Sequence, residues 1–323
     1  MNQLMVKKVL PHVVAIFIFF ALSAIFFSPF IFDGKVLHQG DNEKASAVQS
    51  EINKYNEETG KAPLWTNACF SGMPAVQIYQ VSKGNLTQYI FRTLLLGNSV
   101  TAPHSNILLA MLCMYLLLTV MRLDWRISLI GSIVFGLSTF NMDIIAAGHS
   151  TKMVALAYTP AILAGAILAF RGKYMLGAAM FALFTALQMY ANHYQITYYT
   201  FLIVAVLGIS ELVNAIRTNT SLGFGKAALS LIGGLAIAVL TNLTTIWTTL
   251  EYQAESTPLR WQIEPMLTTR VASGSRPYLA RSVRRSWAAA KRSMRSMSTQ
   301  LASVRKLSLA LCSSWICRVA RAV

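Results

Sequence analysis

Residues 11–32 read PHVVAIFIFFALSAIFFSPFIF, a run of 22 residues without a charged side chain, and this stretch decides the fold class. A helix of about that length spans the ~30 Å hydrocarbon core of a bilayer. Lys7 and Lys8 precede the run, as basic residues precede a signal peptide, but a signal peptide has a shorter apolar part that ends at a cleavage site of small residues. Bulky residues and a proline stand at that place here: Phe26, Phe27, Pro29 and Phe30. The run therefore predicts an uncleaved membrane anchor.

The rest of the chain is also too apolar for a water-soluble protein. Of its 323 residues, 55% are hydrophobic and 12% are charged, whereas roughly a quarter of an ordinary soluble domain is charged. Six further apolar runs follow the first, at about 105–121, 127–140, 153–170, 175–191, 196–213 and 227–245. The run at 127–140 is short and also fits a re-entrant segment. We expect an all-α fold, a polytopic membrane helix bundle with about seven transmembrane helices.

Basic residues predict how this bundle is oriented. They fall at alternate ends of the runs, as the pairs Lys7/Lys8, Arg122/Arg126, Arg171/Lys173 and Arg217/Lys226. Under the positive-inside rule this side faces the cytoplasm. We therefore expect a multi-pass protein of a bacterial inner membrane, with a cytoplasmic N-terminus and a large external loop at 33–104.

The external loop has a helical pattern of its own. Ala45, Val48, Ile52 and Tyr55 recur at steps of three and four, so residues 42–59 read as an amphipathic helix that starts near Asp41 and ends at Gly60. Later in the loop, the apolar-rich stretch 86–95 surrounds Arg92. It fits a segment that lies in the membrane interface.

Asp41 is the first candidate for chemistry, because it follows the first apolar run by only nine residues. A carboxylate there lies close to the outer membrane surface, where it can act as a base on a lipid-borne substrate. The alternative is structural, since Asp is a favoured N-cap of a helix. Lys44 at the third position after it provides no capping box.

Three further polar groups lie at the external ends of apolar runs. His149 and Lys152 share one short connection, and an ammonium beside an imidazole fits a phosphate site, although Lys152 also fits a side chain that extends to the lipid headgroups. Asn192, His193 and Gln195 form the second group, and Glu251 beside Tyr252 forms the third. Polar residues at membrane depth usually face a bundle interior or a cavity. Belt and cap roles are the alternative for Glu251 and for the tyrosines that follow Gln195.

Several site classes lack support in this sequence. No Walker A, GxGxxG, GxSxG or HExxH pattern occurs, so nucleotide, serine hydrolase and zincin chemistry are not expected. Cys69, Cys113, Cys312 and Cys317 have no CxxC spacing, so neither a zinc site nor a disulfide framework is indicated. We expect no metal site, no nucleic-acid partner and no protein partner.

Four segments together resemble the bacterial YfhO family, with a likeness that covers nearly all of residues 1–257. They are LHQGD at 37–41, PLWTNACFSGMP at 63–74, AAGHSTKM at 146–153 and ANHYQITYY at 191–199. That family is similar to the GT-C membrane glycosyltransferases, which take a sugar from a polyprenyl phosphate and place an acidic residue in the first external loop. The resemblance implies that residues 1–257 form a GT-C-like module that transfers a sugar to a cell-envelope acceptor.

By this resemblance Asp41 matches the catalytic acid. Asp41 would act as general base or positioner for an acceptor hydroxyl, while His149 and Lys152 would bind the departing lipid phosphate. The implied partners are the polyprenyl-phosphate-linked sugar donor and membrane lipids, and the resemblance names no cofactor. Two other readings remain open, a transporter or lipid flippase and a gene fragment without activity. A transporter would carry polar residues near the midplane and broken helices.

Residues 258–323 differ in composition from the rest of the chain. Up to residue 257 the sequence has 15 Lys and Arg against 11 Asp and Glu, a net charge of +4, whereas the last 66 residues have 13 against 1, a net of +12. Family members are usually longer than 257 residues. We interpret residues 258–323 as a basic, Arg- and Ser-rich tail produced by a shift of the reading frame, and expect no compact fold there. A solvated basic tail is the alternative.

Overall fold

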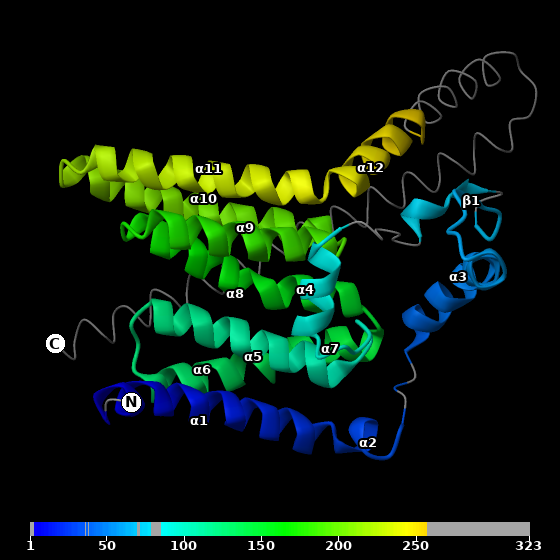
Figure 1. Cartoon of the computed structure of the whole chain (residues 1–323), viewed down its shortest axis with the longest axis horizontal. Helices are drawn as coiled ribbons and strands as arrows, with labels where there is room; N and C mark the ends of the chain where they lie inside the picture. Colours follow the sequence, from blue (N-terminus) through cyan, green and yellow to red (C-terminus); the bar gives the residue numbers. More distant parts are fainter. Residues whose placement is uncertain (1–2, 36, 38, 70–71, 79–84, 257–323) are drawn as a thin grey trace, which may run out of the picture. The chain divides into compact units, whose positions relative to one another are not determined.

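The structure, a computed structural model, describes residues 3–35, 37, 39–69, 72–78 and 85–256 (Figure 1). Its helices are α1 (Gln3–Phe26), α2 (Ser28–Ile31), α3 (Gly40–Thr59), α4 (Thr87–Leu94), α5 (Pro103–Val120), α6 (Trp125–Gly136), α7 (Thr139–Ala147), α8 (Ser150–Phe170), α9 (Tyr174–Tyr190), α10 (Tyr194–Arg217), α11 (Ser221–Thr241) and α12 (Leu243–Ser256). Two short strands and a 3-10 turn complete the described elements: β1 (Trp65–Thr66), β2 (Met73–Pro74) and η1 (Ala75–Gln77). The predictions for residues 258–323 lie outside the described residues.

Six helical segments in the described part of the chain are long and apolar enough to cross a membrane. They are the α1 stretch Val9–Phe26, α5, the α6–α7 stretch Trp125–Ala147, α8, α10 and α11. Helix α9 is equally apolar but has only 17 residues. The expected multi-pass helical bundle is therefore confirmed, and the predicted run at 175–191, which is not among these six, corresponds to the shorter α9.

The first span ends six residues earlier than the sequence predicts. We expected one apolar helix over 11–32, whereas α1 ends at Phe26 and the short α2 follows it. Pro29 explains the break, because it has no backbone N–H to donate to the preceding turn. It lies in the first turn of α2, where that N–H would be unpaired in any case.

The run at 127–140 is divided between two helices, which together form the 23-residue candidate span Trp125–Ala147. It belongs to the consecutive helices α6 and α7, which meet between Gly136 and Thr139. The side-chain amide of Asn141 donates to the carbonyl oxygens of Phe135 (2.7 Å) and Gly136 (3.2 Å). Backbone carbonyls freed by a helix break in a membrane need such partners, so Asn141 stabilises the break.

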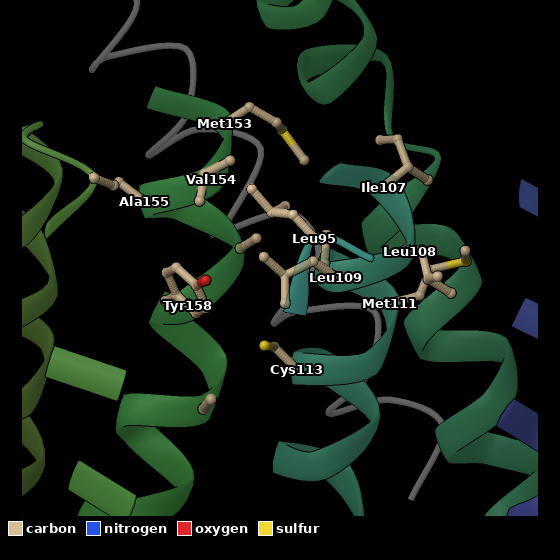
Figure 2. Close-up of a cluster of buried hydrophobic side chains, with 14 of the residues drawn as sticks. Leu95, Ile107, Leu108, Leu109, Met111, Cys113, Met153, Val154, Ala155 and Tyr158 are labelled. Atoms are coloured by element: carbon tan, nitrogen blue, oxygen red, sulfur yellow. The ribbon is translucent and has the colours of Figure 1, made fainter. Parts of the chain in front are cut away.

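Helix α8 is the central element of the bundle. It packs against α5, α7, α9, α10 and α11, and 72% of its positions are buried, against 11% in α10. Figure 2 shows Tyr158 of α8 and Cys113 of α5 in the apolar cluster between these helices, together with Leu95 from the segment that follows α4. The segment that follows α4 is thereby anchored to the bundle core.

Glycines allow α8 and α9 to approach closely. A Cβ on Gly177 of α9 would lie 2.4 Å from the backbone nitrogen of Ala169 and 2.7 Å from the carbonyl oxygen of Gly165, both in α8. Small residues at such positions are typical of membrane helix interfaces, where close backbone packing replaces the hydrophobic driving force.

The basic residues predicted to share one side gather at one end of the bundle. The Arg171 guanidinium, just after α8, donates to the carbonyl oxygen of Val120 in the last turn of α5. Phe170 stacks on Phe224 near the start of α11, with ring centroids 5.6 Å apart. We call this the basic end, and we call the opposite end, where α8 begins and α9 ends, the polar end.

Candidate functional site

The start of α3 docks on the turn between α7 and α8 at the polar end. The buried Gln39 side chain donates from Nε2 to the carbonyl oxygen of Ile145 in α7. The Asn42 amide donates to Gln39 Oε1 and to the hydroxyl of Ser150, the latter at 3.2 Å. Two of these three hydrogen bonds thus join residues more than 100 positions apart in the sequence.

Gly148 makes this close approach feasible. It ends α7 in the left-handed conformation, with φ at +88°, which glycine adopts without the strain that a Cβ would add. A Cβ at this position would lie 3.2 Å from the backbone nitrogen of Asn42 and 3.4 Å from the Cβ of Asp41. The α7–α8 turn therefore contacts the first turn of α3 through bare backbone.

Two of the predicted site residues meet here. The carboxylate of Asp41 (Oδ2) lies 3.3 Å from the imidazole Nδ1 of His149. Their side chains are 45% and 48% exposed, so the pair is accessible from solvent without being fully surrounded by it. Lys44 places its ammonium 3.7 Å from the other carboxylate oxygen, but that side chain is 81% exposed and the contact is correspondingly weak.

The capping alternative for Asp41 is not what the structure shows. Helix α3 begins at Gly40, its N-cap is Gln39, and no side chain caps it. Asp41 lies in the first turn, where a carboxylate still interacts favourably with the positive end of the helix dipole. Its oxygens, however, contact His149 and Lys44.

His193 lies close enough to His149 and to Lys152 to interact with both electrostatically. Burial lowers the pKa of His193, and the positive charges of Lys152 and His149 lower it further. His193 is half-buried, and its Nε2 atom is buried without a hydrogen-bond partner. The Lys152 ammonium lies over the Phe140 ring, 5.7 Å from its centroid. Two histidines and a lysine thus approach one another at the polar end.

The start of α8 adds to the positive potential there. His149 is its N-cap, and its first turn contains no acidic residue while Lys152 lies in it. A cation near the positive end of a helix dipole is unfavourable by a few tenths of a kcal/mol to about 1 kcal/mol. The unpaired N–H groups of such a turn favour an anion. This turn, with Lys152 and His149, is therefore suited to a phosphate group.

The remaining predicted residues are less closely associated with the site. Asn192 is exposed and has φ at +56°, a conformation that asparagine tolerates, so it serves the turn between α9 and α10. Gln195 is also exposed and donates to the Tyr199 hydroxyl at 2.9 Å, one turn further along α10. Glu251 is an exposed residue of α12, and among the described interactions none joins it to Asp41 or His149.

Sequence reasoning missed the residues that hold the site together. Gln39 and Asn42 flank Asp41, and Ser150 follows His149, so their polarity at the ends of apolar segments was the available signal. This polarity does not identify their hydrogen-bond partners, because the partners depend on which two interhelical connections lie side by side in the fold. Glu51, further along α3, plays a similar role for the loop: it accepts from the Thr66 hydroxyl (2.6 Å) and the backbone N–H of Asn67 (3.0 Å), and these bonds lower its pKa.

Within the described residues, no three His, Cys, Asp or Glu side chains converge as a set of metal ligands. Comparison of the chain with known protein families, with characterised proteins and with solved structures finds no match.

Proposed function

We propose that this chain is a GT-C-like membrane glycosyltransferase that transfers a sugar from a polyprenyl-phosphate donor to a cell-envelope acceptor. The observation that carries the proposal is the contact between Asp41 of the first loop and His149 at the start of α8, at 3.3 Å. Resemblance of the segments at 37–41, 63–74, 146–153 and 191–199 to the YfhO family supports it.

The proposed reaction is a direct displacement. The acceptor hydroxyl oxygen forms a bond to the anomeric carbon, the bond from that carbon to the lipid-phosphate oxygen breaks, and the hydroxyl proton passes to Asp41. His149 donates a hydrogen bond that holds the carboxylate in position. The departing phosphate leaves with the bonding electron pair, and Lys152 with the α8 first-turn amides stabilises its charge.

In this proposal the protein lies in a bacterial inner membrane with its basic end in the cytoplasm. The polar end then faces outward, where the lipid-linked donor presents its sugar. Asp41 follows the first membrane helix closely, which keeps the carboxylate near the headgroups. The donor therefore reaches the site from the bilayer and the acceptor from the aqueous side.

A transporter or lipid flippase is the second candidate, and the break between α6 and α7 is the observation that favours it. Transporters use such breaks to expose backbone carbonyls to an ion or substrate. Here Asn141 already occupies the freed carbonyls of Phe135 and Gly136. The carbonyl oxygens at the break therefore have hydrogen-bond partners within the chain. The polar residues around His149 lie at a helix end. Both features favour surface chemistry over passage.

The test is a transfer assay on the purified chain in lipid nanodiscs. A panel of undecaprenyl-phosphate hexoses is supplied with cell-envelope polymer as acceptor, and released undecaprenyl phosphate is measured. We expect Asp41→Asn to reduce release by at least about 100-fold, the usual loss when a positioned proton acceptor is removed. Glu57→Gln is the matched control, because Glu57 is another exposed acid of α3, and it should leave release unchanged.

Equal activity of the Asp41→Asn variant and the wild type would exclude the proposed role of Asp41. If neither the wild type nor the Asp41→Asn variant releases undecaprenyl phosphate from any donor, the proposal is contradicted. That result would favour a gene fragment without activity. Coupled movement of a solute or lipid across a vesicle membrane, without release of undecaprenyl phosphate, would favour the transporter.

A further inference from the structure

A cavity at the polar end is lined in part by Thr151, in the first turn of α8. Its volume is about 490 Å³, and its wall combines α4, the connection 97–100, Thr151 of α8 and the end of α9 at Tyr190 and Ala191. Asp41, His149 and Lys152 do not line it, whereas Thr151 belongs to the α8 first turn that the proposed reaction also uses. Thr151 connects this cavity to the candidate site, because its neighbours in the chain are Ser150 and Lys152.

The polar part of this cavity carries a single charge. Among the described residues that line it, Arg92 alone is charged at neutral pH, and it forms no ion pair or hydrogen bond with a described side chain. Gln88 lies one helical turn before it on the same face of α4. Thr151 contributes the α8 first turn, whose N–H groups lack helical partners. A guanidinium beside such donors matches the geometry of a phosphate group.

The apolar part of the cavity distinguishes a lipid from a free anion. Phe91, Leu95 and Val100 line it beside the polar groups. Phe91 also anchors α4, because its ring contacts Tyr190 with centroids 5.0 Å apart. On the side of α4 away from this anchor, Leu86, Tyr89 and Ile90 are exposed. An exposed apolar face on a short helix at the end of a membrane bundle is typical of a segment at the lipid interface.

We propose that this cavity binds the phosphate headgroup of a membrane lipid, with Arg92 and Thr151 on the phosphate and Phe91 and Leu95 against the start of the lipid chain. The inference goes beyond sugar transfer and does not depend on it, because binding requires neither Asp41 nor turnover. Two sources share this chemistry, an anionic phospholipid and an isoprenoid phosphate.

The test is native mass spectrometry of the full chain in a non-ionic detergent. Phosphatidylglycerol, undecaprenyl phosphate and diacylglycerol are added separately, and inorganic phosphate is added as a competitor. We expect one tightly retained molecule of a phosphate-headed lipid and no retained diacylglycerol. Arg92→Gln should weaken retention at least about tenfold, the effect of one lost hydrogen bond between charged groups, and Arg92→Lys should restore part of it.

Lys226→Gln is the matched control, because it removes one exposed positive charge at the basic end of the bundle. It should leave retention unchanged, and Asp41→Asn should do the same. Preference for phosphatidylglycerol or for undecaprenyl phosphate would identify the source, and either supports the site if it requires Arg92. Equal effects of Arg92→Gln and Lys226→Gln, full competition by inorganic phosphate, or binding of neither lipid would overturn the proposal.

Discussion

At the scale of single residues, the pKa of His193 depends on the charges at the polar end. Burial and the charges of Lys152 and His149 lower its pKa, so the folded protein favours the neutral imidazole. Its contribution to stability is therefore fully present above the ordinary value of 6.5, and it is lost as the pH falls below that value. A ligand that neutralises Lys152 would weaken this effect.

Lys152→Gln should raise the pKa of His193, because it removes one of the two positive neighbours. The rise should be partial, since burial is the largest cause of the shift and the substitution leaves it in place. Histidine NMR of isotope-labelled protein across pH 5 to pH 8 measures it. Lys44→Gln is the control, because this exposed lysine contacts Asp41 instead. Equal His193 titration in the Lys152→Gln variant and the wild type would show that the two side chains lie apart.

Gly148→Ala should destabilise the contact between α3 and the α7–α8 turn. Both Gly148 and Gly60 have positive φ, at +88° and +67°, so an alanine costs roughly 1–2 kcal/mol of backbone strain at either position. At Gly60 the added methyl group meets no atom within 4 Å, whereas at Gly148 it presses on Asn42, Gln39 and Asp41. We expect a lower thermal unfolding temperature for Gly148→Ala than for Gly60→Ala, and loss of any transfer activity in the former alone.

The residue scale is where the sequence predicts least. Asp41 and His149 were recognisable as polar residues at the ends of apolar runs, and the structure pairs them. Nothing in the spacing indicates that Gln39 bonds to Ile145, because that bond depends on the fold bringing two distant turns together. Asn192 was a candidate site residue because of its polarity. Its positive φ instead fits a role in the turn between α9 and α10.

At the scale of helices, close packing between α8 and α9 should be sensitive to a single methyl group. We expect Gly177→Ala to lower the thermal unfolding temperature in detergent, because its Cβ would lie 2.4 Å from the α8 backbone. Gly233→Ala is the matched control within α11, where the Cβ meets nothing within 4 Å. It should be neutral or stabilise by up to about 1 kcal/mol, the gain of alanine over glycine in a helix. Equal unfolding temperatures for the two variants would contradict this packing.

Hydropathy predicted the existence of the spans well and their boundaries less well. Membrane helices produce long apolar runs, so the runs at 153–170 and 196–213 correspond to α8 and α10. The break at Pro29 and the junction between α6 and α7 were missed, because both interrupt sequence that remains apolar. The predicted helix at 42–59 is confirmed and begins two residues earlier, at Gly40, where Gln39 fixes the chain.

At the scale of the whole molecule, the sidedness of the bundle can be measured with single cysteines. We expect Ser46→Cys in the external loop to react with a membrane-impermeant thiol reagent in intact cells. Arg122→Cys and Lys173→Cys at the basic end should react only after the membrane is opened. The positive-inside rule supplies this prediction. Labelling of Arg122→Cys but not of Ser46→Cys in intact cells would show that the bundle has the opposite orientation.

The most direct test of the site is whether the first loop reaches the start of α8. In a background whose four natural cysteines are serines, the pair Asp41→Cys/His149→Cys is treated with a short bifunctional thiol reagent. A protease site inserted beside the exposed Lys61 then separates the two positions. Position 54 provides the control, because it lies on α3 about 20 Å from position 41 at 1.5 Å per helical residue. We predict that the fragments stay linked for the 41/149 pair and separate for Lys54→Cys/His149→Cys. Separation of the 41/149 fragments, or equal linking of both pairs, would contradict the proposed site.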